Sequence, residues 1–205
     1  MAFSRIFYSI LLLFFPVFPS NGQKSTQKCQ QLVHLGDSTT LSMQNYLKND
    51  YKSMGFTNVI VDATNGGSIW YPNGYSGVEK VRKYKKPGTC WVIALGTNDS
   101  ASTSHVNWQP RFDSIMDVIG TDPVMWVNVW YNSSTRPNYN VFVATGWNAF
   151  LIRNKTFLPT ITIYDWATTA KSHPEWFLSD GLHYTDTGSK QRSYWVSRMA
   201  SFLLH

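Results

Sequence analysis

Hydrophobic positions along the chain form short apolar runs that alternate with segments of helical periodicity. The run at 90–95, Cys-Trp-Val-Ile-Ala-Leu, is apolar throughout, which is typical of a parallel strand buried on both faces. Together the runs predict five strands, at 30–35, 59–61, 90–95, 123–130 and 160–164. Between them, apolar residues recur every three or four positions and predict helices over about 41–54, 76–84, 112–119, 141–153 and 187–204.

The regular alternation of strands and helices predicts the fold class. Strand–helix–strand units build a parallel sheet, and both faces of such a sheet are covered by helices. We therefore expect one α/β domain, a three-layer α/β/α sandwich around a five-stranded parallel sheet. Ligands bind such sheets outside the carboxyl ends of the strands.

The first 22 residues do not fit this pattern. Arg5 precedes an apolar run, 6–18, and small residues follow, ending at Gly22. This arrangement predicts a secretory signal peptide, 1–22, that is cleaved after Gly22. The alternative is a membrane anchor, but the run is shorter than the roughly 20 residues that span a bilayer. We expect a mature domain, 23–205, that is secreted or extracytoplasmic and has no transmembrane segment.

Composition and charge narrow the class of protein. The chain has 205 residues, of which 43% are hydrophobic and 15% charged, as in a single globular domain. Its net charge of +6 suits attraction to anionic polymers, and a solvated helix face is the alternative explanation for its densest basic cluster, at Lys80, Arg82, Lys83, Lys85 and Lys86. No nucleic-acid-binding module is visible, so we expect no nucleic-acid partner. A monomer is the default expectation.

Residue types with catalytic chemistry follow the predicted strands in four blocks. Each block alone has an ordinary explanation as a helix cap or a turn. In chain order they are Gly36-Asp37-Ser38, Asn65-Gly66-Gly67, Gly96-Thr97-Asn98-Asp99 and Asp180-Gly181-Leu182-His183.

Taken together, the four blocks supply every part of a serine hydrolase site. A serine hydroxyl needs an adjacent base, and an imidazole held by a carboxylate is such a base. His183 lies three positions after Asp180, so one turn of chain can bring their side chains together. A backbone N–H near Gly67 and the amide of Asn98 could stabilise an oxyanion beside Ser38. Because all four blocks fall at one edge of the predicted sheet, their combination indicates catalysis.

On these blocks the chain resembles the SGNH (GDSL-like) hydrolases over about residues 30–204. The resemblance implies a flavodoxin-like sheet of order 2-1-3-4-5, with Ser38 as nucleophile, His183 as base and Asp180 as its orienting carboxylate. The implied oxyanion donors are the N–H groups of Ser38 and Gly67 and the side chain of Asn98. Gly66 is an alternative to Gly67.

Two further implications follow from the resemblance. This chemistry needs no metal and no organic cofactor. The first block continues with Thr39 where the common form is Gly-Asp-Ser-Leu, and we expect Thr39 to alter only the packing behind the nucleophile.

A narrower resemblance concerns the substrate. The stretches Ile163-Tyr164-Asp165-Trp166 and Pro174-Glu175-Trp176-Phe177 resemble the SGNH domains of bacterial cell-wall O-acetyltransferases and their secreted relatives. The resemblance implies an esterase or acyltransferase acting on small acyl (acetyl) esters of a carbohydrate or cell-wall polymer. The alternatives are a lipase or thioesterase with a longer acyl substrate, and an inactive fold used for wall binding.

Aromatic residues fit the carbohydrate hypothesis. The sequence has nine tryptophans and eleven tyrosines. Rings in loops bordering the site could stack on sugars, although packing in the core is the alternative for each of them. The candidates are Trp70, Tyr71, Trp108, Trp130 and Trp176.

The implied strand order also bears on Cys29 and Cys90. It puts the first and third strands side by side, with Cys29 seven residues before Gly36 and Cys90 six before Gly96. Because neighbouring strands lie within disulfide reach, we expect a Cys29–Cys90 disulfide in the exported protein.

Overall fold

The computed structural model describes residues 29–70, 76–102 and 107–205. The predicted signal peptide, 1–22, and Tyr71 lie outside the described residues. Within those ranges, no helix is both long enough and apolar enough to cross a membrane.

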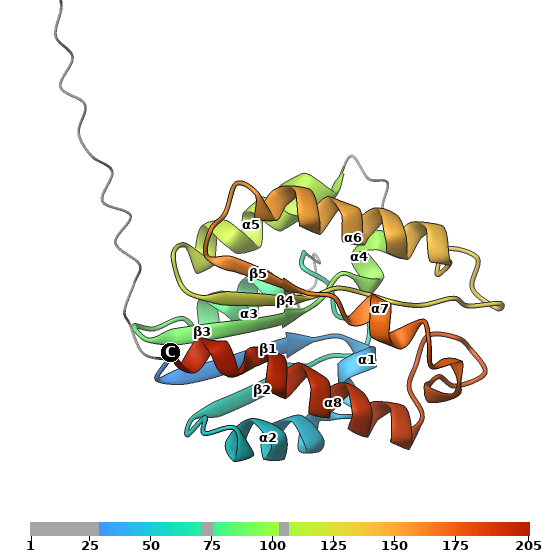
Figure 1. Cartoon of the computed structure of the whole chain (residues 1–205). Helices are drawn as coiled ribbons and strands as arrows, with labels where there is room; N and C mark the ends of the chain where they lie inside the picture. Colours follow the sequence, from blue (N-terminus) through green and yellow to red (C-terminus); the bar gives the residue numbers. More distant parts are fainter. Residues whose placement is uncertain (1–28, 71–75, 103–106) are drawn as a thin grey trace, which may run out of the picture.

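Among the described residues, five parallel strands form one sheet of order β2-β1-β3-β4-β5 (Figure 1). This order confirms the predicted topology, and helices cover both faces of the sheet. Every residue of β1, β3 and β4 is buried, which explains why these strands are mostly apolar in sequence. The strands are β1 (Gln31–Gly36), β2 (Val59–Ala63), β3 (Thr89–Ala94), β4 (Val124–Val127) and β5 (Ile161–Tyr164).

Two groups of helices sandwich the sheet (Figure 1). One face carries α3 (Gly77–Tyr84), α4 (Thr97–Ser102), α5 (Trp108–Ile119) and α6 (Val141–Lys155). The opposite face carries α2 (Gln44–Ser53), α7 (Trp166–Ala170), α8 (Asp186–Ala200) and the short 3-10 helices η2 (Pro174–Trp176) and η3 (Ser201–Leu204). The four-residue helix α1 (Ser38–Leu41) follows β1 directly.

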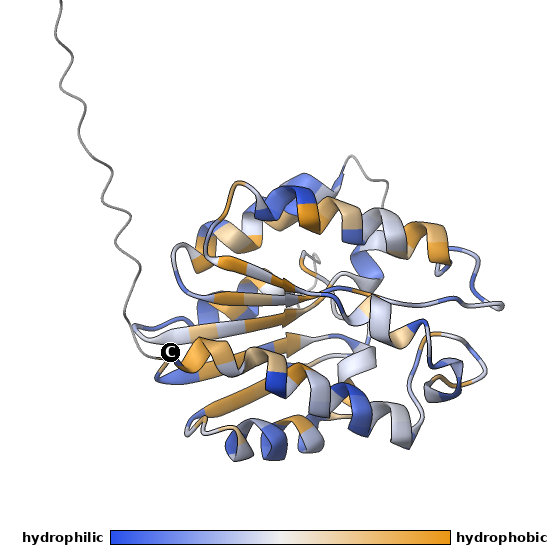
Figure 2. Cartoon of the chain, in the orientation of Figure 1, coloured by the Kyte–Doolittle hydropathy of each residue, from blue (hydrophilic) through white to orange (hydrophobic). Residues whose placement is uncertain are grey.

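Alternation of side chains along the strands divides the core in two. Val33 and Leu35 of β1 pack in the layer toward α5 and α6, whereas Leu32 packs in the layer toward α2 and α8. Trp91 and Ile93 of β3 follow the same rule on the first side. In Figure 2 the strands carry mostly hydrophobic colouring and the outer helix faces mostly hydrophilic colouring.

Polar side chains cap the first turns of α3, α6 and α8. Ser76 accepts a hydrogen bond from the N–H of Glu79 at the start of α3. Asn140 does the same for α6, and Thr185 accepts from the N–H of Gly188 at the start of α8. These side chains satisfy N–H groups that have no partner within the helix.

The register brings the carboxyl ends of three strands to one level. Gly36, at the end of β1, pairs with Ala63 of β2 and with Ala94 of β3. The segments that leave these strands carry the first three predicted blocks, so they meet at one edge of the sheet. The fourth block lies between η2 and α8.

Candidate active site

Ser38 is the first residue of α1, directly after the central strand β1. Asp37 caps this helix, with its Oδ1 accepting the backbone N–H of Thr39 at 2.9 Å. A Cβ built at Gly36 would collide with the side chain of Thr40, so only glycine lets the chain turn this tightly. The tight turn leaves Ser38 half-buried while its neighbours Asp37 and Thr39 are buried.

Asp180 and His183 lie on the loop between η2 and α8, and their side chains meet. Asp180 Oδ1 accepts the backbone N–H groups of Leu182 and His183, each at 3.0 Å. Asp180 Oδ2 lies 2.6 Å from His183 Nδ1. Gly181 has a φ of +63°, a left-handed conformation that favours glycine and lets the loop close in one turn.

The structure brings the three predicted triad residues together across 145 positions of sequence. His183 Nε2 lies 3.0 Å from Ser38 Oγ, while Nδ1 faces Asp180. Partial burial alone would raise the pKa of Asp180, but its hydrogen bonds from the His183 side chain and from the loop backbone outweigh this and lower that pKa. Asp180 is therefore ionised, and its oxygens can only accept hydrogen bonds. Because Nδ1 of His183 must donate to it, a neutral His183 carries its proton on Nδ1. Nε2 is then left to accept the hydroxyl proton of Ser38.

The predicted oxyanion residues lie beside Ser38. A Cβ built at Gly67 would lie 3.2 Å from Gly36 O and 3.4 Å from Asp37 Cα, so Gly67 passes close behind the nucleophile turn. Its N–H donates to Thr64 O at 2.9 Å, and its carbonyl accepts from Asn98 Nδ2 at 2.8 Å. Gly66 is exposed and has open space around it, whereas Gly67 lies against the nucleophile turn. Donation from Gly67, Ser38 or Asn98 to an oxyanion stays a prediction.

Asp99 of the third block, with Tyr139 and Arg111, which the sequence did not single out, holds Asn98 and its loop. Tyr139 donates its hydroxyl to Asn98 Oδ1 at 2.9 Å. Asp99 is fully buried, accepts the N–H of Ile69 and pairs with Arg111 Nη1 at 2.7 Å. Burial, only partly offset by the hydrogen bond from Arg111, raises the pKa of Asp99 to about 6. Asp99 thus ties α4 to the segment after Gly67.

Two of the predicted sugar-stacking tryptophans lie in the core. Trp108 is 5% exposed and packs edge-on against Trp147, and Trp176 is 7% exposed and stacks on Trp166. Each follows a loop in sequence, but Trp108 lies on the buried face of α5, and the ring of Trp176 is stacked with those of Trp166 and His173.

The other two described candidates are accessible. Trp70 is 55% exposed, and Trp130 is half-buried and lines two hollows. Only these two of the four described candidates can therefore meet a ligand.

The cysteines are free, buried thiols in the structure, so the predicted disulfide is not shown. The prediction aligned Gly36 with Gly96, but Gly36 pairs with Ala94, and Cys90 therefore faces Leu32. The Cys29 thiol donates to the carbonyl of Gln31 at 3.5 Å, and the Cys90 thiol donates to that of Leu203 at 3.9 Å. The neighbouring Cys29 side chain and burial both raise the pKa of the Cys90 thiol. A disulfide between these neighbours remains a prediction.

Within the described part of the chain, no group of three or more His, Cys, Asp or Glu side chains could hold a metal ion. The arrangement at Ser38 instead suits acyl transfer through a serine, in which a base, a carboxylate and nearby hydrogen-bond donors do the work.

Comparison with known proteins identifies the fold. No protein-family model matches the sequence. The chain is 23% identical over 171 residues to a protein of Bacillus subtilis (strain 168) named "Putative peptidoglycan O-acetyltransferase YrhL". That similarity covers 82% of the chain but only 23% of YrhL, so the chain spans about a quarter of this relative.

Solved structures agree in architecture. The C-terminal catalytic domain of peptidoglycan O-acetyltransferase A from Streptococcus pneumoniae superposes with a TM-score of 0.67 at 20% identity, covering 86% of this chain and 95% of the domain. A lipase/acylhydrolase from Enterococcus faecalis gives 0.68 at 17% identity, covering 85% and 97%. A member of the lipolytic G-D-S-L family from Veillonella parvula gives 0.62 at 15%, covering 84% and 97%. The chain therefore has the SGNH (GDSL-type) hydrolase fold.

Proposed function

We propose that this chain is a secreted serine esterase or acyltransferase that acts on small acyl esters, above all acetyl esters, of a carbohydrate or cell-wall polymer. The observation that carries the proposal is the continuous line from Ser38 Oγ through His183 to Asp180, with contacts of 3.0 and 2.6 Å. Two of the similar proteins are peptidoglycan O-acetyltransferases by name, which supports a cell-wall polymer as the substrate.

The first half of the reaction acylates Ser38. Ser38 Oγ attacks the ester carbonyl carbon while its proton passes to His183 Nε2, and Asp180 stabilises the imidazolium that results. The carbonyl oxygen becomes an oxyanion on the side of Gly67 and Asn98. When the carbonyl re-forms, the C–O bond to the sugar breaks, and His183 returns the proton to the leaving alcohol.

The second half transfers the acyl group to an acceptor. Water or a sugar hydroxyl gives its proton to His183 Nε2 and attacks the acyl-Ser38 carbonyl. Collapse of the second tetrahedral intermediate breaks the bond to Ser38 Oγ, which regains the proton. Water yields a free acid, whereas a sugar hydroxyl yields a new ester, and the same residues serve both outcomes.

The substrate class is tested by acyl chain length and by polymer. We expect faster turnover of p-nitrophenyl acetate than of the octanoate, and release of acetate from O-acetylated peptidoglycan. A clear preference for octanoate would favour the lipase or thioesterase alternative. Adding a glycan acceptor together with the acetyl ester separates the two reactions, because a transferase forms acetylated glycan and a hydrolase forms acetate.

Export is part of the proposal and has its own test. Residues 1–22 have the composition of a signal peptide. Amino-terminal sequencing of the protein recovered outside the cytoplasm should begin at Gln23. Recovery only inside the cell, with Met1 retained, would contradict export.

A further inference from the structure

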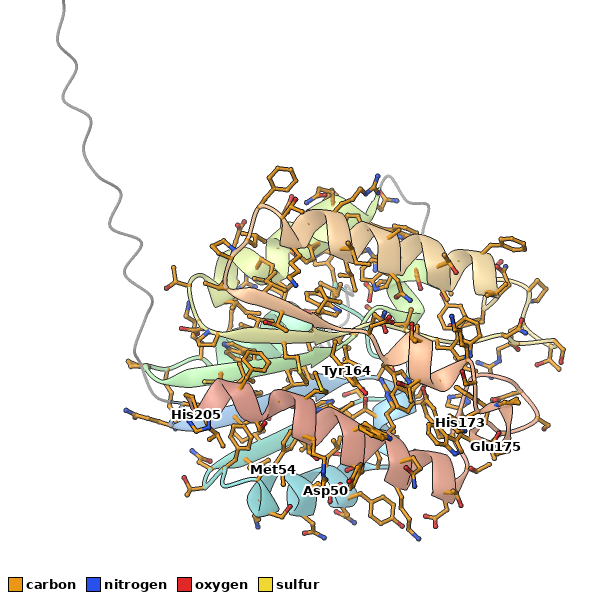
Figure 3. The ribbon with its side chains drawn as sticks, in the orientation of Figure 1. Asp50, Met54, Tyr164, His173, Glu175 and His205 are labelled. Atoms are coloured by element: carbon orange, nitrogen blue, oxygen red, sulfur yellow. The ribbon has the colours of Figure 1, made fainter. Side chains whose placement is uncertain are left out.

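A surface groove runs between α2 and α8, and none of its lining residues belongs to the four catalytic blocks. It is a hollow of about 560 Å³ and is open to solvent. In Figure 3, Asp50 projects from α2 toward α8, and these two helices lie side by side in Figure 1. We call this hollow the α2–α8 groove, and its lining consists of Tyr46, Asp50, Lys190, Gln191, Tyr194 and Trp195.

Aromatic rings in the groove are exposed yet held in place. Tyr194 and Trp195 are each 41% exposed, and their rings meet edge to face at 5.4 Å. On the other wall, Tyr46 donates its hydroxyl to Asp186 at 2.7 Å, and Lys190 pairs with the same carboxylate at 2.7 Å. Rings that are already ordered lose little conformational entropy when a ligand stacks on them.

The groove belongs to the same two elements that carry the candidate triad. Helix α1, which begins at Ser38, leads directly into α2, and α8 begins three residues after His183. The hydroxyls of Ser42 and Ser189 lie 3.0 Å apart and join the two segments where they leave the active site. A linear ligand lying along α2 and α8 would therefore extend from the edge of the sheet where Ser38 lies.

The chemistry of the lining points to a saccharide chain. Flat aromatic rings pack against the C–H faces of sugar rings, while carboxylate, amide and ammonium groups hydrogen-bond to hydroxyls. A long acyl chain would instead require an enclosed apolar pocket. We infer that the α2–α8 groove binds a segment of the polymer whose esters react at Ser38. The inference rests on the proposed function and adds a binding site distinct from the triad.

Affinity electrophoresis tests this inference. The mature protein is run through gels containing glycol chitin, a soluble β-1,4-linked N-acetylglucosamine polymer, or hydroxyethyl cellulose. The Tyr194→Ala/Trp195→Ala variant should bind about tenfold more weakly than wild type, the loss expected for two stacking rings. Phe142→Ala is the matched control, because Phe142 is 84% exposed on α6, outside the groove.

Each outcome decides the matter. Retardation of wild type and of the Phe142 variant, but not of the double variant, supports the groove. No retardation of wild type by either polymer, or equal retardation of all three proteins, overturns it. A wild-type dimer in sedimentation that the double variant abolishes also overturns it, in favour of a protein interface. The rate of p-nitrophenyl acetate hydrolysis should be equal in all three proteins. No hydrolysis by wild type would refute the proposed ester chemistry, while polymer binding at the groove would still be judged by the gels.

A second and independent observation lies beneath the nucleophile. Arg192 of α8 is only 4% exposed, and within the described residues it has no ion pair with a carboxylate. Its Nη1 donates to the carbonyl of Thr39 at 3.2 Å and to Thr39 Oγ1 at 2.8 Å. Thr39 Oγ1 in turn donates to Asp37 Oδ1 at 2.7 Å. The Thr39 hydroxyl thus links the buried guanidinium of Arg192 to the fully buried carboxylate of Asp37. In the sequence, Ser38 lies between Asp37 and Thr39.

This relay explains the unusual residue after Ser38. A leucine at position 39, as in the common Gly-Asp-Ser-Leu block, would leave the buried guanidinium with the backbone carbonyl of residue 39 but without its side-chain acceptor. We infer that Thr39 and Arg192 are positioning residues, which hold the Asp37 cap and so fix the nucleophile. These contacts show that Thr39 makes hydrogen bonds in addition to the packing that we expected from the sequence.

A double-mutant cycle tests the relay. Thr39→Val removes the hydroxyl at nearly constant volume, Arg192→Met removes the charge, and Thr39→Ser keeps the hydroxyl. We expect Thr39→Val to lower kcat about tenfold with little change in KM, and Thr39→Ser to keep most of the wild-type kcat. The double variant Thr39→Val/Arg192→Met should have a kcat no lower than that of the worse single variant. Strictly additive losses, or a Thr39→Val enzyme with wild-type kcat, would overturn the inference. Circular dichroism ensures that only folded protein is compared.

Discussion

The Asp180→Asn substitution keeps the shape of the candidate triad but changes its charge and its pattern of donors. In the native protein Asp180 Oδ2 accepts from His183 Nδ1, and Oδ1 accepts the N–H groups of Leu182 and His183. The asparagine oxygen can take over the two backbone bonds, so its NH₂ group then faces Nδ1. Nδ1 must become the acceptor, which moves the imidazole proton to Nε2.

As a result, His183 carries a proton on Nε2, the nitrogen that has to accept the proton of Ser38. A protonated Nε2, 3.0 Å from Ser38 Oγ, cannot take the hydroxyl proton. The equivalent change in a serine protease triad lowers kcat about 10⁴-fold, which corresponds to about 5 kcal/mol of activation free energy. Because the asparagine preserves the backbone bonds of the loop, we expect the free energy of unfolding to change by less than about 1 kcal/mol.

Steady-state hydrolysis of p-nitrophenyl acetate at pH 7 measures this loss. Urea unfolding of the same samples shows whether the fold is intact, and Asp180→Ala serves as the control that removes the loop bonds as well. A folded Asp180→Asn protein that keeps more than a tenth of wild-type kcat would refute the idea that Asp180 sets the tautomer of His183.

Three other predictions concern the rest of the molecule. Burial, assisted by the charge of Arg192, lowers the pKa of His34 to about 3. The native state therefore binds fewer protons than the unfolded chain, and stability present above pH 6.5 is lost as pH falls toward 3. Between pH 6.5 and 4.5 urea unfolding should show a loss of about 2 kcal/mol that His34→Gln lacks, and parallel curves for both proteins would be inconsistent with a neutral His34. Tyr139→Phe removes the hydroxyl that holds Asn98 and should lower kcat/KM about tenfold, measured on p-nitrophenyl acetate; an unchanged value would separate Tyr139 from the reaction. Intact mass before and after reduction and alkylation of the exported protein should reveal a Cys29–Cys90 disulfide, and two thiols alkylated without reduction would exclude it.

The sheet and the triad could be predicted because both depend on local signals that recur. Each buried strand is an apolar run, and parallel strands bring their carboxyl ends to one edge whatever their separation along the chain. This rule is why Ser38 and His183 could be expected to meet. The short helices α4 and α7 were not predicted, because five or six residues are too few to show a helical period.

Other features depend on tertiary contacts that no local pattern encodes. Arg192 is a polar residue in an amphipathic helix and is expected at the surface, yet it lies beneath Thr39 and against Tyr184. The strand register offset by two residues moved Cys90 away from its predicted partner position. Trp195, which was not among the predicted ring platforms, is exposed on α8.

Hydrolysis of p-nitrophenyl acetate by the mature protein, 23–205, beside its Ser38→Ala variant tests serine ester chemistry most directly. In the proposed mechanism Ser38 Oγ is the atom that attacks the ester carbonyl carbon, and the methyl group of alanine fits its half-buried position. We predict a loss of at least about 10³-fold in kcat with an unchanged circular dichroism spectrum. Equal rates in the two proteins, or no hydrolysis by either, would contradict the account and leave wall binding by an inactive SGNH fold as the better explanation.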